Sequence, residues 1–113
     1  MANNIAFTPM GKTVQVTASA AAVNNAVLTA DSPSNQYRLV NHAGQPVYAW
    51  ISPGTSPVNV ALPTSTGQYA IVIPPNTVSI VTGPQCTNTA NVRVSVISES
   101  GTPELYVTPG EGL

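Results

Sequence analysis

Charged residues are scarce in this sequence. Three Lys or Arg and four Asp or Glu make up 6% of the 113 residues, whereas a typical soluble domain is about 25% charged. A protein that binds nucleic-acid phosphates needs clustered cations, but Lys12, Arg38 and Arg93 are far apart in the chain. The composition therefore predicts no nucleic-acid partner.

Long apolar runs and paired cysteines are also missing. No stretch approaches the roughly 18 apolar residues that a membrane-spanning helix needs. The first residues, MANNIAFTPMGK, lack the basic stretch and apolar core of a secretion signal. The single cysteine, Cys86, has no partner for an intramolecular disulfide. We expect synthesis in the cytoplasm and no membrane partner.

Groups for acid–base, nucleophilic or metal chemistry are few. The chain has one His, one Cys, one Asp and three Glu, and no nucleophile elbow or phosphate-binding glycine motif. One histidine is too few for a jelly-roll metal site. His42 lies in a predicted loop, and Cys86 lies in a predicted turn without a cation to stabilise a thiolate. The sequence predicts no enzyme activity, no cofactor and no metal.

What the chain does have is β-branched and neutral polar residues. It contains 15 Val and 6 Ile for a core, and 38 Ser, Thr, Asn and Gln for a surface. Eleven Pro and eight Gly divide it into short segments, within which apolar and polar residues alternate with a period of two. Eight strands are predicted, at about 13–18, 26–30, 36–41, 47–52, 69–73, 77–82, 91–96 and 104–108. The fold class is all-β, a single sandwich of short antiparallel strands.

The breaks between strands indicate the connections. Residues 41–46 are predicted to form a hairpin loop in which Gly44 takes positive φ, and residues 74–76 a similar loop. The segment 53–67 is predicted to be the longest surface connection. The alanine-rich segment 18–26 is compatible with a hairpin through Asn24-Asn25 or with a helical turn, and we favour the hairpin.

The two ends differ from the middle. We expect an N-terminal arm at 1–12, a core at 13–108 and a C-terminal tail at 109–113. The apolar residues of these ends are interface candidates, namely Ile5, Phe7, Met10 and Leu113. Two interpretations stay open: both ends pack on their own domain, or they are arms laid on neighbouring subunits.

Two aromatic residues complete the interface candidates. Tyr48 and Trp50 share one face of the strand 47–52, opposite the aliphatic Val47, Ala49 and Ile51. An exposed Tyr–Trp pair can anchor a protein interface or stack against a sugar. The alternative is that Trp50 is the large core residue of the sandwich with Tyr48 at its edge.

Four segments carry a family resemblance. The opening MANNIAFTPMGKTVQVTA, the central QYRLVNHAGQPVYAWIS, the later IPPNT and the close ELYVTPGEGL resemble small virion structural proteins of tailed bacteriophages, similar to capsid decoration or cement proteins. The resemblance covers nearly the whole chain, although none of these motifs carries chemistry.

The resemblance implies a jelly-roll-like sandwich and a structural role. Such a protein would be made in the host cytoplasm and located on the capsid surface of the virion. It would form a homo-oligomer, with a trimer preferred and a dimer possible, and would bind the major capsid protein at junctions between subunits. The alternative is a glycan-binding β-sandwich module of a phage tail or fibre.

Overall fold

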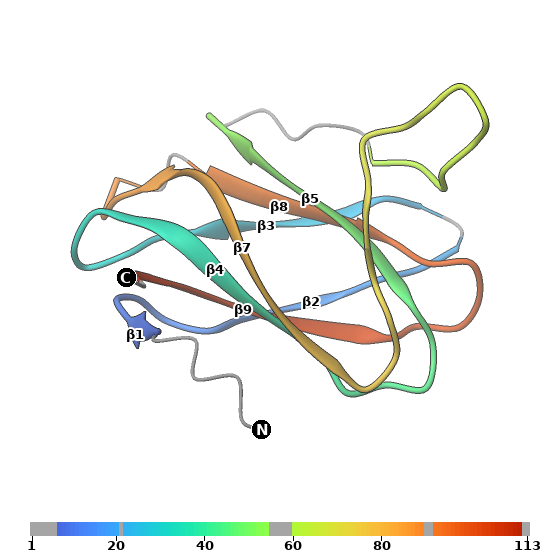
Figure 1. Cartoon of the computed structure of the whole chain (residues 1–113), viewed down its shortest axis with the longest axis horizontal. Coiled ribbons are helices and arrows are strands. Elements are labelled where there is room, and N and C mark those ends of the chain that lie inside the picture. The colour runs from blue at the N-terminus through green and yellow to red at the C-terminus, as the bar shows by residue number, and fades with distance from the viewer. Residues whose placement is uncertain (1–6, 21, 55–59, 90–91, 112–113) are drawn as a thin grey trace.

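A computed structural model describes residues 7–20, 22–54, 60–89 and 92–111 (Figure 1). These residues contain no helix and form nine strands, all paired antiparallel. The strands are β1 (Thr8–Pro9), β2 (Val14–Thr17), β3 (Asn24–Leu28), β4 (Ser34–Asn41), β5 (Val47–Pro53), β6 (Ile71–Ile73), β7 (Thr77–Cys86), β8 (Val92–Ile97) and β9 (Glu104–Glu111). The prediction of an all-β sandwich is confirmed.

The strands form two sheets. Sheet A has the order β1-β9-β4-β7, and β2 pairs with the same strand β9 as β1 does. Sheet B has the order β3-β8-β5-β6. Apart from β1 to β2 and β5 to β6, each connection between consecutive strands crosses from one sheet to the other. The two four-stranded orders β2-β9-β4-β7 and β3-β8-β5-β6 are those of a jelly roll.

The core lies between the sheets and is mostly aliphatic. Alternate residues of each strand point inward, as Val92, Val94 and Val96 of β8 show, each with no exposed surface. Leu39 of β4 and Leu105 of β9 are equally buried from the opposite sheet. Each fully buried aliphatic side chain contributes roughly 1.5–3 kcal/mol, which makes this alternation the main source of stability.

Three segments predicted as hairpin turns do not form hairpins, because the strands before and after each segment belong to different sheets. Residues 41–46 and 74–76 are corners between the sheets, and Asn24-Asn25 lie within β3, which pairs with β8. The segment 18–26 therefore contains neither the hairpin nor, in its described residues, a helical turn. Gly44 does not have positive φ, whereas Asn76 has φ of 54°.

At its buried end, the 41–46 corner is held together by the side chain of Asn41. The amide Nδ2 donates to the carbonyl oxygens of Gln45 (2.8 Å), Ile73 (3.2 Å) and Pro74 (3.2 Å). The carbonyl Oδ1 accepts from the backbone N–H of Ala43 at 3.1 Å. Asn41 has no exposed surface, so one buried amide joins this corner to the end of β6.

Strand β7 is longer than predicted and includes the expected turn around Cys86. Three residues of β7, at positions 83–85, face Asn35 alone on β4, which is a bulge. Pro84 is tolerated because β7 is an edge strand and needs no N–H on its open side. Cys86 is consequently a buried strand residue and not part of a turn.

The two ends of the described chain pair with each other. Thr8 is opposite Glu111 and Pro9 is opposite Gly110, so β9 supplies the partner strand of the N-terminal segment. The boundary expected at residue 108 falls inside β9, because residues 109–111 continue its pairing with β4 and β1. Ile5 and Leu113 lie outside the described residues.

The long connection after β5 matches its prediction over the residues described. Residues 60–70 contain no strand, and the segment begins from Gly54 with φ of 85°. Val60 is 2% exposed, so this connection is attached to the domain by at least one buried apolar side chain.

Candidate interaction surface

Trp50 and Tyr48 lie on the outer face of sheet B, as the period of two predicts. Val47, Ala49 and Ile51 are buried on the inner face, while Tyr48 and Trp50 are only partly buried. Trp50 is therefore not a core residue, in contrast to the alternative interpretation of the sequence.

Tyr69, which the sequence analysis did not single out, completes an aromatic pair with Trp50. The two ring centroids are 5.4 Å apart and the planes are tilted by 58°. Such tilted packing is a favourable aromatic geometry. Tyr69 is 60% exposed, so much of its ring is open to a ligand or partner. No local sequence signal marks Tyr69, because it follows a broken segment and lies just before β6.

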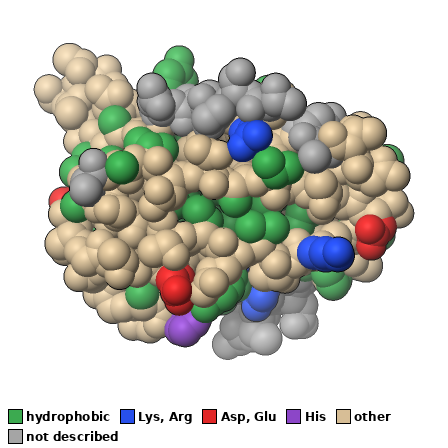
Figure 2. Space-filling view, turned by 180° about the vertical axis from the view of Figure 1, so that it is seen from behind, with side chains coloured by type: hydrophobic (Ala, Val, Ile, Leu, Met, Phe, Trp, Pro, Cys, Tyr) green, Lys and Arg blue, Asp and Glu red, His purple; other side chains and the backbone are tan. Residues whose placement is uncertain are grey.

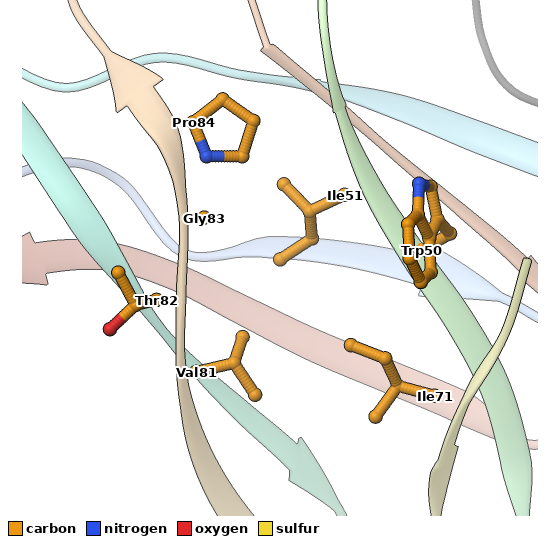
Figure 3. Close-up of a pocket in the computed structure, with 7 residues that line it drawn as sticks. All are labelled: Trp50, Ile51, Ile71, Val81, Thr82, Gly83 and Pro84. Carbon is orange, nitrogen blue, oxygen red and sulfur yellow. The ribbon is translucent and has the colours of Figure 1, made fainter.

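A groove lies beside this pair, between β7 and the strands β5 and β6 (Figure 3). Its volume is about 230 Å³, and it is lined by Trp50, Ile51, Ile71, Val81, Thr82, Gly83 and Pro84. In Figure 3, Ile51, Ile71 and Val81 point toward one another into the groove, while Thr82 points away. These three aliphatic residues also pack in or against the core, so the groove is a place where the sandwich is open at its side.

Large exposed hydrophobic side chains occur in one stretch of the described sequence. They are Leu62, Tyr69, Val72 and Val78, with exposed fractions of 37%, 60%, 48% and 51%. All four therefore lie between residues 62 and 78, in the connection before β6, in β6 and at the start of β7. Charged side chains are few on the rear of the molecule, where mostly neutral atoms cover the surface (Figure 2).

The N-terminal interface candidates Phe7 and Met10 lie beside β9 of sheet A. Met10 is partly buried and packs against the core of its own domain, and its N–H donates to the carbonyl of Pro109 at 3.0 Å. Phe7 is also partly buried and lines an open groove of about 320 Å³ with Pro9, Thr13, Arg38 and Thr108. In the described residues, this segment therefore packs on its own domain, and the groove beside Phe7 remains accessible.

His42 is exposed on the 41–46 corner and its ring stacks on Tyr106. The ring centroids are 5.4 Å apart with an angle of 5° between the planes. The hydroxyl of Tyr106 lies 3.4 Å from Glu104 Oε1. The stack lies on the surface of the domain.

Cys86 and Tyr37 are buried together at the end of β7. The Cys86 thiol donates to the carbonyl of Leu28 at 3.2 Å, and the Tyr37 hydroxyl donates to the carbonyl of Pro84. Burial raises the pKa of Cys86, an effect that its hydrogen bond with Tyr37 partly offsets. Burial, followed by the charge and hydrogen bond of Cys86, raises the pKa of Tyr37. Both groups stay protonated at neutral pH, so the thiol is a poor nucleophile.

Three buried polar atoms on sheet B lack a hydrogen-bond partner. They are Ser52 Oγ, Ser95 Oγ and Arg93 Nε. Ser52 and Arg93 are paired across β5 and β8, and Ser95 is paired with Trp50. Arg93 is held at its other end by a 2.9 Å bond from Nη1 to Asn25 Oδ1.

Other classes of site and known relatives give no further assignment. Within the described part of the chain, no three His, Cys, Asp or Glu residues lie close enough to hold a metal ion. No described helix is long and apolar enough to cross a membrane. Comparison with protein-family models, curated proteins and solved structures finds no match.

Proposed function

We propose that this protein is a structural component of a tailed-bacteriophage virion, a decoration protein that binds the outer surface of the capsid. In this role it associates with the major capsid protein and with copies of itself, and it performs no reaction. It is made in the host cytoplasm and ends on the capsid surface.

The observation that carries this proposal is the grouping of exposed hydrophobic side chains. Leu62, Tyr69, Val72 and Val78 lie within 17 residues of sequence, on a domain with only seven charges. Exposed apolar groups surrounded by neutral polar ones favour association through buried area and not through ion pairs. A protein that holds a shell together needs exposed groups of this kind.

The fold supports the proposal without deciding it. The jelly roll is used by viral capsid domains and also by lectin domains. Fold alone does not determine function, so the choice between these uses depends on the surface.

A glycan-binding module is the second candidate, and the Trp50–Tyr69 pair favours it. Tyr69 is 60% exposed and lies with Gln68 and Gly67 beside a shallow depression of about 270 Å³. An aromatic face next to an amide side chain is a combination that binds sugars. Gln68 supplies polar atoms beside the ring, which suits a carbohydrate better than it suits a capsid surface.

The test is whether the protein is bound to particles. An antibody raised against the purified chain is used to label virions from the source lysate after density-gradient purification, and the particles are imaged by electron microscopy. We expect labelling over the capsid surface. Protein that stays in the soluble fraction, with no labelled particles, would contradict the proposal.

Two variants connect the binding to the proposed surface. Tyr69→Ala should reduce the fraction bound to undecorated particles at least tenfold, because it removes an exposed anchor. Asn88→Ala, at an exposed position outside residues 62–78, is the control and should bind as the parent does. A glycan array probed with the parent separates the second candidate, which alone predicts saturable binding to a sugar.

A further inference from the structure

Strand β7 is the one long strand at an open sheet edge in the described structure. It has ten residues and pairs only with β4. The other edge strands, β1, β2, β3 and β6, have between two and five residues. An edge strand presents a row of unpaired N–H and C=O groups that can pair with another extended chain.

The usual protection against such pairing is weak on β7. Its sequence, TVSIVTGPQC, contains no charged residue. Natural edge strands are commonly blocked by Lys, by proline or by a bulge, and here Pro84 and the bulge occur only near the C-terminal end. Asn76, with φ of 54°, leaves the extended conformation just before the strand begins. The open edge therefore runs from Thr77 to Gly83.

The groove of Figure 3 lies directly along this edge. Val81 and Gly83 line one side, and Ile51 and Ile71 line the other. A strand added to sheet A would lie about 4.8 Å beyond β7, and alternate side chains of that strand would point into the groove. An extended uncharged strand would therefore both pair with the free backbone groups of β7 and cover the open side of the core.

We propose that this occupant is β7 of a second copy of the chain, paired antiparallel about a two-fold axis at Ile80. This axis uses the whole open edge, since it pairs Thr77 with Gly83 and places Ile80 opposite its copy. Ser79 then lies opposite Val81 on the groove side, and Val78 lies opposite Thr82 on the outer side. In this register each cross-strand pair joins two residues that point inward or two that point outward, so the faces of the two β7 strands match.

Charge is the reason for choosing a second copy. Self-pairing brings identical residues together, so any charge on the strand would meet its own sign, and β7 has none. The only charged residue of the neighbouring strand β4 is Arg38, which is opposite Ile80. The two copies of Arg38 would be separated by three strand spacings, about 14 Å, which exceeds the screening length of about 10 Å at 0.1 M salt.

The dimer is measured without the capsid, although Val78 belongs both to the β7 edge and to the exposed hydrophobic residues proposed for capsid binding. It requires only the β7 edge, and it is a property of the isolated protein. It also differs from the expected trimer, because antiparallel pairing of one edge with itself closes after two copies.

Sedimentation velocity of the isolated protein between about 1 and 100 µM tests the proposal. We expect a species of twice the 11.6 kDa chain mass. Val78→Lys should weaken the dimer at least tenfold, because a lysine on an edge strand disfavours pairing with another strand. Val72→Lys is the matched control, since Val72 is 48% exposed and Val78 is 51% exposed. Circular dichroism confirms that both variants fold.

A cross-link tests the register. Under mild oxidation Ile80→Cys should form a covalent dimer, because the two thiols face each other across the axis. Thr82→Cys should not form a covalent dimer, because position 82 of the second copy lies four residues further along the strand, about 13 Å away. The buried Cys86 is common to both. A monomeric or trimeric parent, equal effects of the two lysine variants, or equal cross-linking of the two cysteine variants would overturn the proposal.

Loss of dimer and loss of capsid binding are separable outcomes. If the parent is a dimer that labels no particles, the decoration role fails and the β7 interface stands. If the parent is a monomer that labels capsids, the reverse holds.

Discussion

The ring of Phe7 lies directly over the backbone of Gly110. A Cβ at position 110 would come within 2.7 Å of Phe7 Cε1 and even closer to Cζ of the same ring and to the carbonyl oxygen of Thr8. Only glycine allows the N-terminal segment to approach β9 so closely, and this approach pairs β1 with β9.

Gly110→Ala should therefore displace Phe7 and separate β1 from β9. Overpacking of this kind costs about 1–3 kcal/mol in the free energy of unfolding. Chemical denaturation measures the cost. Gly44→Ala is the control, since nothing lies within 4 Å of a Cβ there and φ is not positive, so its stability should be unchanged or slightly higher. Equal stabilities of the two variants would show that Phe7 does not need this contact.

Asn41→Ala should be among the most destabilising single substitutions. It leaves the carbonyls of Gln45, Ile73 and Pro74 without their side-chain donor. A buried polar group without a partner costs about 1–3 kcal/mol, so we expect a total loss of about 3 kcal/mol or more. Asn88→Ala, at an exposed position, should change stability by less than about 0.5 kcal/mol. A loss below about 1 kcal/mol for Asn41→Ala would mean that water replaces the amide.

Stability should fall as the pH rises through 9 and 10. Cys86 and Tyr37 have ordinary pKa values of 9.0 and 10.0, and both are raised in the folded protein. The unfolded chain therefore loses these protons first. The stabilisation is complete below pH 9 and decreases above it, by up to about 1.4 kcal/mol per pH unit for each group.

Tyr37→Phe tests this pH dependence. Below pH 9 it should cost about 1 kcal/mol, because the hydrogen bond to Pro84 is lost. Above pH 10 the free energy of unfolding should decrease less steeply than in the parent. Tyr69→Phe removes the hydroxyl of an exposed ring and is the matched control. The same slope in Tyr37→Phe and the parent would contradict the assignment.

Association of this protein should be insensitive to salt. The chain has seven charges, and the proposed dimer interface contains none. Between about 0.1 and 1 M NaCl the screening length falls from about 10 to about 3 Å, which weakens ion pairs and leaves apolar burial intact. We expect the dimer dissociation constant to change less than tenfold across this range in sedimentation experiments. Dissociation at moderate salt would point to an interface that includes Arg38.

Local patterns predicted the strands well and their partners poorly. The alternation around Trp50 correctly assigned the inner and outer faces of β5, because a period of two is a property of each strand alone. The corner at 41–46 looks like a hairpin loop because its residues suit any tight turn, and nothing local states which sheet the next strand joins. Gly83-Pro84 suggests a turn, yet a bulge on an edge strand accommodates both.

The candidate surface was predictable only in part. Trp50 follows from the strand period, whereas Tyr69 lies in an irregular segment, and its contact with Trp50 arises from tertiary structure. The groove between β5 and β7 joins residues about 30 positions apart, and the fold alone brings them together.

The central position of β9 sets the timing of folding. This strand pairs with β1, β2 and β4, yet it is the last described strand that the ribosome makes. The strand pairs of sheet A that include β9 therefore cannot be complete until residue 111 has left the exit tunnel. Strand β2 in particular pairs with residues about 90 positions away in sequence. Such non-local pairing makes folding slow, in the range of milliseconds to seconds. During synthesis the unpaired strands are available to wrong partners, so a protein with this topology depends on completing its chain before it meets other chains.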